Sequence, residues 1–475
     1  MDAPSPTRPR ARHQRGRPQR PRAGGAPTAT RLLALRVLER VQRSGAYADV
    51  LLHAHLGRSC LPAADRAFVT DLVNGTLRWR GRLDFLLAHV VDRDLDKLEP
   101  LVANALRLGA YQIAMADNVP DRAAVDQTVR CVRAAGVERA TGLVNAALRR
   151  LAVEHAAIAL PDLESDPLGH LAHALSLPAW LAARWIEIFG PHTAAALAHA
   201  LNQIPPLTVR ANRLRVQPGA LLAELRERFP DAAPCRYARD GLVLGRRGNP
   251  ALEPAFLEGR FTVQDEASQL VVALLDPQPG ERVLDACAAP GGKATGIAER
   301  VGPAGEVVAV DRHPRRLDLV RRHARRLGLE RVRAVDRDAA RSVADLAPAG
   351  GFDRILVDAP CSGLGALRRN PDARWRVAPS DIPRLAETQR ALLRSAAAAL
   401  RPGGALVYST CTLVPEENED VVAAFLARAP EFEVAPAAEC PVEARGLIGA
   451  DGFLRCLPHV HDTDGFFAAR LVRRS

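Results

Sequence analysis

The sequence RVLDACAAPGGK at residues 282–293 decides the fold of the C-terminal half of the chain. It joins a short apolar run to a turn with two adjacent glycines, and the pattern from residue 295 onward is helical. A glycine-rich turn between a strand and a helix lets a bound ligand approach the backbone closely. The turn fits neither G-x-G-x-x-G nor G-x-x-x-x-G-K-[ST], so it is neither the dinucleotide fingerprint nor a P-loop. We therefore expect a strand, a ligand-binding turn and a helix.

Four further apolar runs follow this segment, separated by amphipathic helical stretches; they are residues 307–310, 332–335, 355–357 and 405–408. Such alternation is typical of βαβ units and predicts a parallel, doubly wound sheet of the Rossmann-like α/β class. Two more strand-like pieces, residues 453–457 and 466–469, are expected to close the sheet as a hairpin. We assign residues 261–475 to this domain.

The pattern changes three times upstream of residue 261. Residues 156–260 combine a helical linker with a small α+β module, and residues 28–155 have the apolar spacing of an all-helical bundle. Residues 1–27 are rich in Pro, Gly and Arg without apolar periodicity, which predicts a disordered arm. The chain is therefore expected to be multidomain.

The composition excludes several classes of protein. Of the 475 residues, 48% are hydrophobic and 25% charged, as in globular proteins, and no stretch is apolar for the ~18 residues of a membrane span. We expect a cytoplasmic protein without a membrane partner. The eight cysteines form no C-x-x-C pair, and His459 and His461 have no further ligands nearby in sequence, so no metal site is expected.

The charge balance favours a polyanionic partner. Lys and Arg number 65 against 54 Asp and Glu, a net charge of +11, which is typical of proteins that bind nucleic acid. Residues 1–27 contain seven arginines and one aspartate, so +6 of the net charge lies in this segment.

The turn at residues 282–293 resembles the AdoMet-binding motif of RNA cytosine-C5 methyltransferases of the RsmB/Sun (Fmu) type. The resemblance implies S-adenosyl-L-methionine as cofactor, with its methionine end lined by Cys287, Ala288, Ala289, Pro290, Gly291, Gly292 and Lys293. Asp311, at the end of the next strand, can accept hydrogen bonds from ribose hydroxyls. For the acid near the adenine we prefer Asp338, with Asp336 as the alternative.

Two cysteines are expected at the same sheet edge, because each follows a predicted strand: Cys361 in DAPCSG (residues 358–363) and Cys411 in STCT (residues 409–412). Methylation at cytosine C5 needs a thiolate that adds to C6, since C5 itself is a poor nucleophile. The resemblance, which continues through PEEN at residues 415–418, implies that Cys411 attacks and Cys361 assists product release. DNA cytosine methyltransferases attack with a Pro-Cys thiol, so Cys361 is the alternative nucleophile.

Two further residues are assigned to the chemistry. Asp358 is placed near the pyrimidine N3, where it can stabilise developing charge, and it is also assigned to the cofactor site. Lys293 is expected to contact the substrate base or the cofactor carboxylate. Arg374 and Trp375 could form a substrate loop that stacks on a nucleotide, with a structural tryptophan as the alternative.

The front half resembles the NusB fold, an RNA-binding bundle, in residues 65–69, 77–79, 107–111 and 144–150. The module after Pro205 resembles the RNA-binding subdomain of the same methyltransferases, and this implies phosphate contacts for Arg210 and Arg213. Together these features predict a monomeric RNA cytosine-C5 methyltransferase that acts on 16S rRNA. The alternatives are the same chemistry on tRNA, and a NusB-like RNA-binding assembly factor whose methyltransferase domain is inactive.

Overall fold

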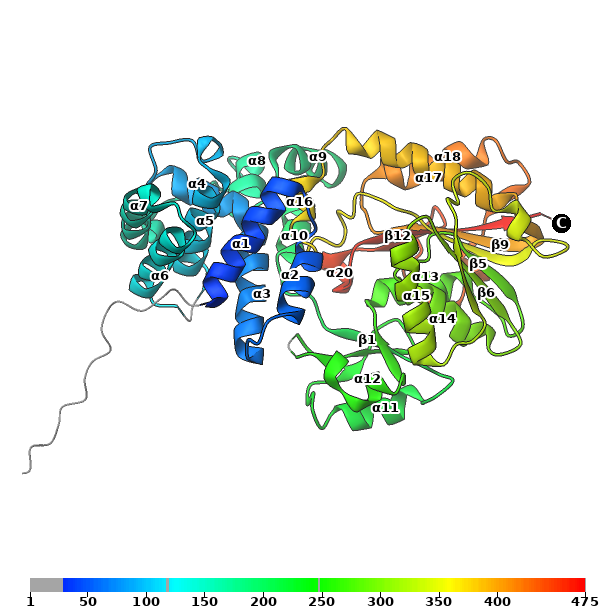
Figure 1. Cartoon of the computed structure of the whole chain (residues 1–475). Helices are drawn as coiled ribbons and strands as arrows, with labels where there is room; N and C mark the ends of the chain where they lie inside the picture. The colour runs from blue at the N-terminus through cyan, green and yellow to red at the C-terminus, as the bar shows by residue number, and fades with distance from the viewer. Residues whose placement is uncertain (1–28, 117–118, 247, 475) are drawn as a thin grey trace, which may run out of the picture.

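The computed structural model describes residues 29–116, 119–246 and 248–474, so the predicted arm at residues 1–27 lies outside the described residues. The chain begins with a helical bundle, continues through a helical connector and a small sheet, and ends in a large sheet covered by helices (Figure 1). The helices of the bundle are α1 (Ala29–Ser44), α2 (Ala48–Gly57), α3 (Ala63–Arg78), α4 (Arg80–Ala88), α5 (Pro100–Ala114), α6 (Asp121–Ala134) and α7 (Thr141–Glu154).

Helix α5 is the centre of the bundle, because nearly all of its residues are buried. Even its arginine is inside: Arg107 is 1% exposed and donates to both carboxylate oxygens of Asp84, at 2.6 and 2.9 Å. Helix α3 approaches α5 so closely that a Cβ atom at Gly75 would overlap the ring of Tyr111. The motif at residues 107–111 therefore forms the packing centre of this domain.

The connector consists of α8 (Pro167–Gly169), the π-helical turn η4 (His170–Ala174), α9 (Ala179–Phe189) and α10 (Pro191–Leu201). Its apolar side chains share one core with Leu364, Leu367 and Leu413, which lie in the loops that follow the two predicted active-site cysteines. The connector is therefore part of the support of the catalytic loops.

The small module contains β1 (Thr208–Ala211), β2 (Ala233–Pro234), β3 (Gly241–Val243) and β4 (Phe261–Val263), with α11 (Pro218–Leu225) and α12 (Pro254–Leu257). Its strands are antiparallel in the order β2-β3-β1-β4. Because β4 pairs with β1, this sheet extends past the boundary that the sequence suggested at residue 260.

The large sheet has the predicted strands and one more, β10 (Phe432–Val434), which the sequence did not indicate. The predicted strands are β5 (Arg282–Asp285), β6 (Glu306–Asp311), β7 (Val332–Asp336), β8 (Phe352–Asp358), β9 (Leu400–Thr410), β11 (Phe453–Cys456) and β12 (Phe466–Arg473). The order is β10-β12-β9-β8-β5-β6-β7, parallel from β9 to β7, while β10 and β12 are antiparallel and β11 pairs with β12 as the expected hairpin. The strand order reverses at β5, where a crevice forms beyond the carboxyl ends of β5 and β8.

Helices cover both faces of this sheet, since each face has its own buried core. One face packs against α13 (Glu266–Leu275), α14 (Gly292–Val301) and α15 (Pro314–Leu327), and the other against α17 (Asp381–Ala397) and α18 (Glu419–Leu426) (Figure 1). The short helices α16 (Ala373–Arg376), α19 (Val442–Arg445) and α20 (Pro458–His461) lie in the connections. Among the described residues, no helix has the length and apolar character needed to cross a membrane.

Candidate active site

A cavity of about 220 Å³ lies at the carboxyl edge of the large sheet, where the strand order reverses. Residues that follow all five parallel strands line it, as expected for this class of sheet. The lining consists of Ala286, Cys287, Ala289, Asp311, Arg312, His313, Arg316, Asp338, Ala339, Ala340, Asp358, Ala359, Pro360, Cys361, Thr388, Leu392 and Cys411.

The glycine-rich turn is shaped by close packing and by one carboxylate. Gly291 has a φ of 110°, and a Cβ atom there would lie 3.0 Å from the Cα atom of Val320 in α15, so only glycine fits. Asp311 accepts hydrogen bonds from the backbone N–H groups of Ala289 (3.3 Å) and His313 (2.9 Å). The end of β6 therefore holds the turn that follows β5.

Five of the residues assigned to the cofactor line the cavity; they are Cys287, Ala289, Asp311, Asp338 and Asp358. The others, Ala288, Pro290, Gly291, Gly292 and Lys293, belong to the same turn but do not form its wall. The walls are mostly small apolar side chains, with a carboxylate at the end of each of two neighbouring strands. This combination fits the flat base and the ribose hydroxyls of an adenosine group.

The structure distinguishes the two acids at the end of β7. Asp338 lines the cavity and accepts a hydrogen bond from the Ala340 backbone N–H at 3.1 Å. Asp336 is the last residue of β7, is exposed, and is not part of the cavity wall. The geometry favours Asp338 as the acid on the adenine side.

The two predicted thiols meet at the cavity: the Sγ atoms of Cys361 and Cys411 lie 3.4 Å apart. They meet because β8 and β9 are parallel neighbours in which Asp358 is paired with Ser409. The hydrogen bond with Cys411, together with burial, raises the pKa of the Cys361 thiol well above its usual value. The raised pKa favours the thiol form of Cys361, and either sulfur can be the donor in the contact between the two cysteines.

Asp358 is held from two sides. One carboxylate oxygen accepts from Lys293 Nζ at 2.7 Å, and the other accepts from Ser409 Oγ at 2.9 Å. Burial lowers the pKa of Lys293, but the nearby Asp358 carboxylate more than offsets this, so the pKa is raised and the ammonium persists. Lys293 also lies 5.0 Å from the centre of the Phe466 ring. Lys293 is thus connected to the cavity by its ion pair with Asp358, because it is not itself part of the cavity wall.

A buried carboxyl group that the sequence did not single out lies behind these residues. Asp285, the last residue of β5, is 1% exposed, and its Oδ2 atom has no hydrogen-bond partner in the described part of the chain. Burial, followed by the charge of Asp358, raises the pKa of Asp285 to about 7. Sequence reasoning treated this position only as the end of a strand, although an acidic residue that ends a buried strand was the available signal.

The PEEN motif at residues 415–418 holds the two cysteine loops together. Glu417 is fully buried and accepts hydrogen bonds from the Ser362 backbone N–H and from Gln389, both at 2.9 Å. Asn418 accepts from Thr410 Oγ1 at 2.5 Å and donates to the Thr412 carbonyl at 3.2 Å. Sequence reasoning used the motif only for its resemblance and missed this supporting role.

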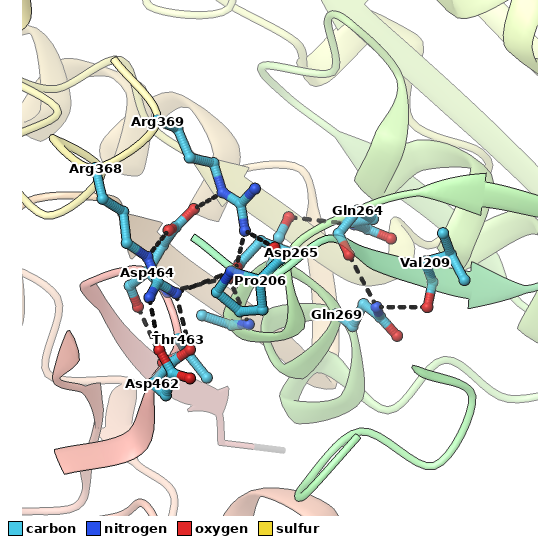
Figure 2. A network of polar contacts seen from close by, with 12 residues as sticks. Pro206, Val209, Gln264, Asp265, Gln269, Arg368, Arg369, Asp462, Thr463 and Asp464 are labelled. Carbon is cyan, nitrogen blue, oxygen red and sulfur yellow. Dashed lines mark hydrogen bonds and ion pairs between the residues drawn. The ribbon is translucent and has the colours of Figure 1, made fainter. Parts of the chain in front are cut away.

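A network of arginines and aspartates fixes the same loops from outside (Figure 2). Asp464, which is 3% exposed, accepts from Arg368 at 2.7 Å and from Arg369 at 2.6 Å. Arg369 also donates to Asp265 at 2.8 Å, and Asp265 caps α13 through the Ala267 backbone N–H. The network therefore joins the loop after Cys361 to the segment before β12 and to the start of α13.

One of the two expected phosphate contacts needs correction. Arg210 is buried, pairs with Glu299 at 2.8 Å and donates to the Gly292 carbonyl at 2.8 Å, so the expected phosphate contact is wrong for this residue. The alternation of apolar and polar residues along β1 distinguishes the two faces of the strand, but it does not show which face packs against α14. Arg213 is exposed and lies 3.4 Å from Asp240.

The expected stacking loop is a domain junction. Arg374 is fully buried and donates to the carbonyls of Arg78 and Ser176, both at 3.1 Å. Trp375 donates to the Leu77 carbonyl at 2.6 Å. These side chains therefore join the bundle and the connector to the catalytic domain, in agreement with the structural alternative for the tryptophan.

The two histidines of α20 differ in their contacts, because His459 Nδ1 is buried without a hydrogen-bond partner among the described residues. His461 Nδ1 accepts from the Leu457 backbone N–H at 2.9 Å. Across residues 29–116, 119–246 and 248–474, no group of three or more potential ligands is arranged to hold a metal ion.

Comparisons with known proteins agree with this architecture. Residues 272–472 match the family described as 16S rRNA methyltransferase RsmB/F, residues 28–153 match the NusB family, and residues 177–249 match the RsmF/B-like ferredoxin-like domain. The chain is 37% identical to the ribosomal RNA small subunit methyltransferase B of Pseudomonas putida, over 93% of this chain and 98% of that protein. It is 36% identical to the "probable ribosomal RNA small subunit methyltransferase B" of Bacillus subtilis, over 94% and 99% of the two chains.

Comparison with solved structures agrees with the family matches. The crystal structure of PH0851 covers 93% of this chain and 98% of its own, with 26% identity and a TM-score of 0.77. A methyltransferase homologue from Pyrococcus horikoshii covers 65% of this chain and 99% of its own, with 30% identity and a TM-score of 0.56. The fold, the cofactor turn and the near-complete coverage of its relatives show that this chain belongs to the RsmB/F family of AdoMet-dependent rRNA methyltransferases, in the form that carries an N-terminal NusB domain.

Proposed function

We propose that this protein methylates C5 of a cytosine in 16S rRNA, with Cys411 as the nucleophile. One observation carries this proposal above the others: two thiols lie 3.4 Å apart at the wall of the cofactor cavity, beside Asp358. The names of the relatives and of the matched family support the small-subunit rRNA as substrate.

The cofactor residues fit AdoMet, because apolar walls lie next to the carboxylates of Asp311 and Asp338. When bound there, AdoMet supplies a methyl group on a sulfonium that a carbon nucleophile can take. We assign Asp311 to the ribose and Asp338 to the adenine side.

Each residue of the site then has a distinct role. The Cys411 thiolate forms a bond to C6 of the cytosine, and the electron pair displaced from the C5–C6 double bond makes C5 nucleophilic. As C6 is attacked, a proton passes from the Lys293 ammonium group through Asp358 to N3, which stabilises the charge that develops on the ring. Lys293 fixes the Asp358 carboxylate and supplies the opposite charge.

Product release requires that a base take the C5 proton, and a water molecule in the open cavity can do so. The electron pair of the C5–H bond then re-forms the C5–C6 double bond and expels the Cys411 thiolate. Cys361 is adjacent to the departing sulfur, and its raised pKa keeps a proton available to it. We assign to Cys361 the protonation of the departing Cys411 sulfur.

The test is methyl transfer from labelled AdoMet into RNA from cells that lack the modification, with cytosine-resolved mapping of the product. We expect a mark in 16S rRNA that is lost in Cys411→Ala, whereas Cys361→Ala accumulates a covalent RNA adduct. Cys60→Ala removes an exposed thiol of the bundle and serves as the control. A methyl group found in tRNA would contradict 16S rRNA as the substrate but would agree with the mechanism. A covalent RNA adduct formed by Cys411→Ala would identify Cys361 as the nucleophile. AdoMet binding without transfer to any RNA would favour the assembly factor.

We further propose that the enzyme acts as a monomer, because a single chain supplies the cavity, both thiols and their supporting loops. Sedimentation at the concentrations used in the activity assay tests this, and activity confined to a dimer would contradict it.

A further inference from the structure

Helix α15 carries a row of arginines that the mechanism does not use. Residues 312–327 contain seven arginines and one aspartate. Arg315, Arg322 and Arg325 are exposed, and none of the three forms an ion pair with a carboxylate of the described residues, whereas the aspartate, Asp318, pairs with Arg321 at 2.8 Å. We name Arg315, Arg322 and Arg325 the α15 arginine face.

The three side chains lie on one side of a rigid support. Separations of seven and three residues place them along the same side of the helix, over about 15 Å. The opposite side of α15 is anchored in the core of the large sheet by Leu317, Val320, Ala324 and Leu327. Figure 1 shows α15 next to α14, the helix that begins at the cofactor turn. The backbone positions of the three arginines are therefore fixed relative to the core of the large sheet.

A stabilising effect on helix α15 does not explain why all three arginines are present. Arg322 and Arg325 are a like-charge pair at i,i+3, which destabilises a helix. Arg315 lies in the first turn, where the helix dipole favours acidic residues and α15 has none. Arg325, in the last turn, is the member that the dipole favours. Two of the three charges therefore cost stability in the free protein.

The α15 arginine face is continuous with the active-site cavity. Arg312, His313 and Arg316, around the start of α15, line the same cavity as the two cysteines. Arg316 also donates to the Ala289 carbonyl at 2.8 Å, which holds its side chain against the cofactor turn. Positive charge therefore extends from the helix surface to the edge of the reaction site.

We propose that the α15 arginine face binds backbone phosphates of the substrate RNA next to the target cytosine. A guanidinium group matches the geometry of a phosphate, and unpaired arginines gain a partner there without breaking an ion pair of the protein. The inference rests on the proposed function, because it takes the RNA substrate as given and identifies one of the surfaces that binds it.

The test compares two variants with the same change in net charge. One is R315Q/R322Q/R325Q. The control, R384Q/R394Q/R428Q, removes three exposed arginines at or near α17 and α18, on the opposite face of the sheet. Binding of transcribed 16S rRNA is measured between about 50 and 200 mM salt, because each phosphate contact contributes about 0.7 to the slope of log K against log salt for a single strand.

We expect the slope of the α15 variant to be smaller than that of the wild type by about 2, and its KM for RNA to rise. The kcat and the AdoMet affinity should stay unchanged, and the control variant should match the wild type. Equal slopes for both variants and the wild type overturn the α15 proposal even if the wild type methylates RNA. If the wild type binds but does not methylate any RNA, the proposed function fails, and the slopes still decide whether the α15 arginine face binds phosphate.

Discussion

Cys361 and Cys411 are 50 positions apart in the sequence, yet their sulfur atoms lie 3.4 Å from each other. The contact is produced by two parallel strands, β8 and β9, that end in the same register. The hydrogen bond with Cys411 and burial raise the pKa of Cys361, which supports the proposed assignment of Cys411 as the nucleophile and Cys361 as the proton donor.

The two acids after β7 provide a matched test of the cofactor site. We expect Asp338→Asn to raise the Kd for AdoMet about tenfold, because a hydrogen bond to a charged acceptor contributes about 1.5–3 kcal/mol. Asp336→Asn should leave the Kd unchanged, since that side chain is outside the cavity. Isothermal titration with AdoMet measures both, and weaker binding in Asp336→Asn alone would reverse the assignment.

Glu417 should affect turnover without touching the substrate. Glu417→Ala leaves the Ser362 N–H and one N–H of the Gln389 amide without their acceptor, which should lower the free energy of unfolding by about 2–4 kcal/mol. We expect kcat to fall while the Kd for AdoMet is retained, because the cysteine loops loosen and the cofactor turn does not. Glu417→Gln keeps one acceptor oxygen and should recover part of the kcat; no recovery would argue against a positioning role.

Asp285 should make stability depend on pH. Its pKa in the folded protein, about 7, is above the ~3.9 of the unfolded chain, so the folded state favours the protonated form. Its contribution is therefore complete at low pH and is lost as pH rises from about 4 through 7. Relative to wild type, Asp285→Asn should gain up to about 4 kcal/mol over this range.

Urea unfolding at several pH values measures this difference. Asp420→Asn, which removes an exposed carboxylate, is the control and should show a nearly constant difference from wild type. A constant difference for Asp285→Asn as well would mean that folding does not raise the pKa of Asp285.

Two glycines of the bundle should respond in opposite directions to the same substitution. Gly75→Ala places a methyl group on the ring of Tyr111 and should lower the free energy of unfolding by about 1–3 kcal/mol. Gly142→Ala meets no atom within 4 Å and should raise it by about 0.5–1 kcal/mol, since alanine is the better helix former. Thermal unfolding checks both, and destabilisation in both variants would show that backbone freedom, not packing, requires glycine in this bundle.

Sequence reasoning predicted the elements whose signals are local. The apolar runs of the large sheet, the turn at residues 282–293 and the hairpin of β11 and β12 all occur where expected. Cys361, Cys411 and Asp358 could be placed together because parallel strands present their carboxyl ends at one edge.

Long-range packing could not be predicted in the same way. The sequence shows that Arg210 alternates with apolar residues. It does not show that the Arg210 side chain points into the protein and forms an ion pair with Glu299. Likewise, nothing local to Trp375 indicates that its acceptor is the carbonyl of Leu77, almost 300 positions earlier in the chain. Such partners are fixed only when the domains have assembled.

The junction at Arg374 has a consequence for how the protein can be divided. The guanidinium group of Arg374 is buried, and it donates to the carbonyls of Arg78 in the bundle and Ser176 in the connector and to Asn202 Oδ1. Excising the NusB domain would remove the Arg78 carbonyl and expose the guanidinium group to water next to the loop that follows Cys361. We therefore expect a fragment that contains only the methyltransferase half to be less stable at this catalytic loop than the intact chain.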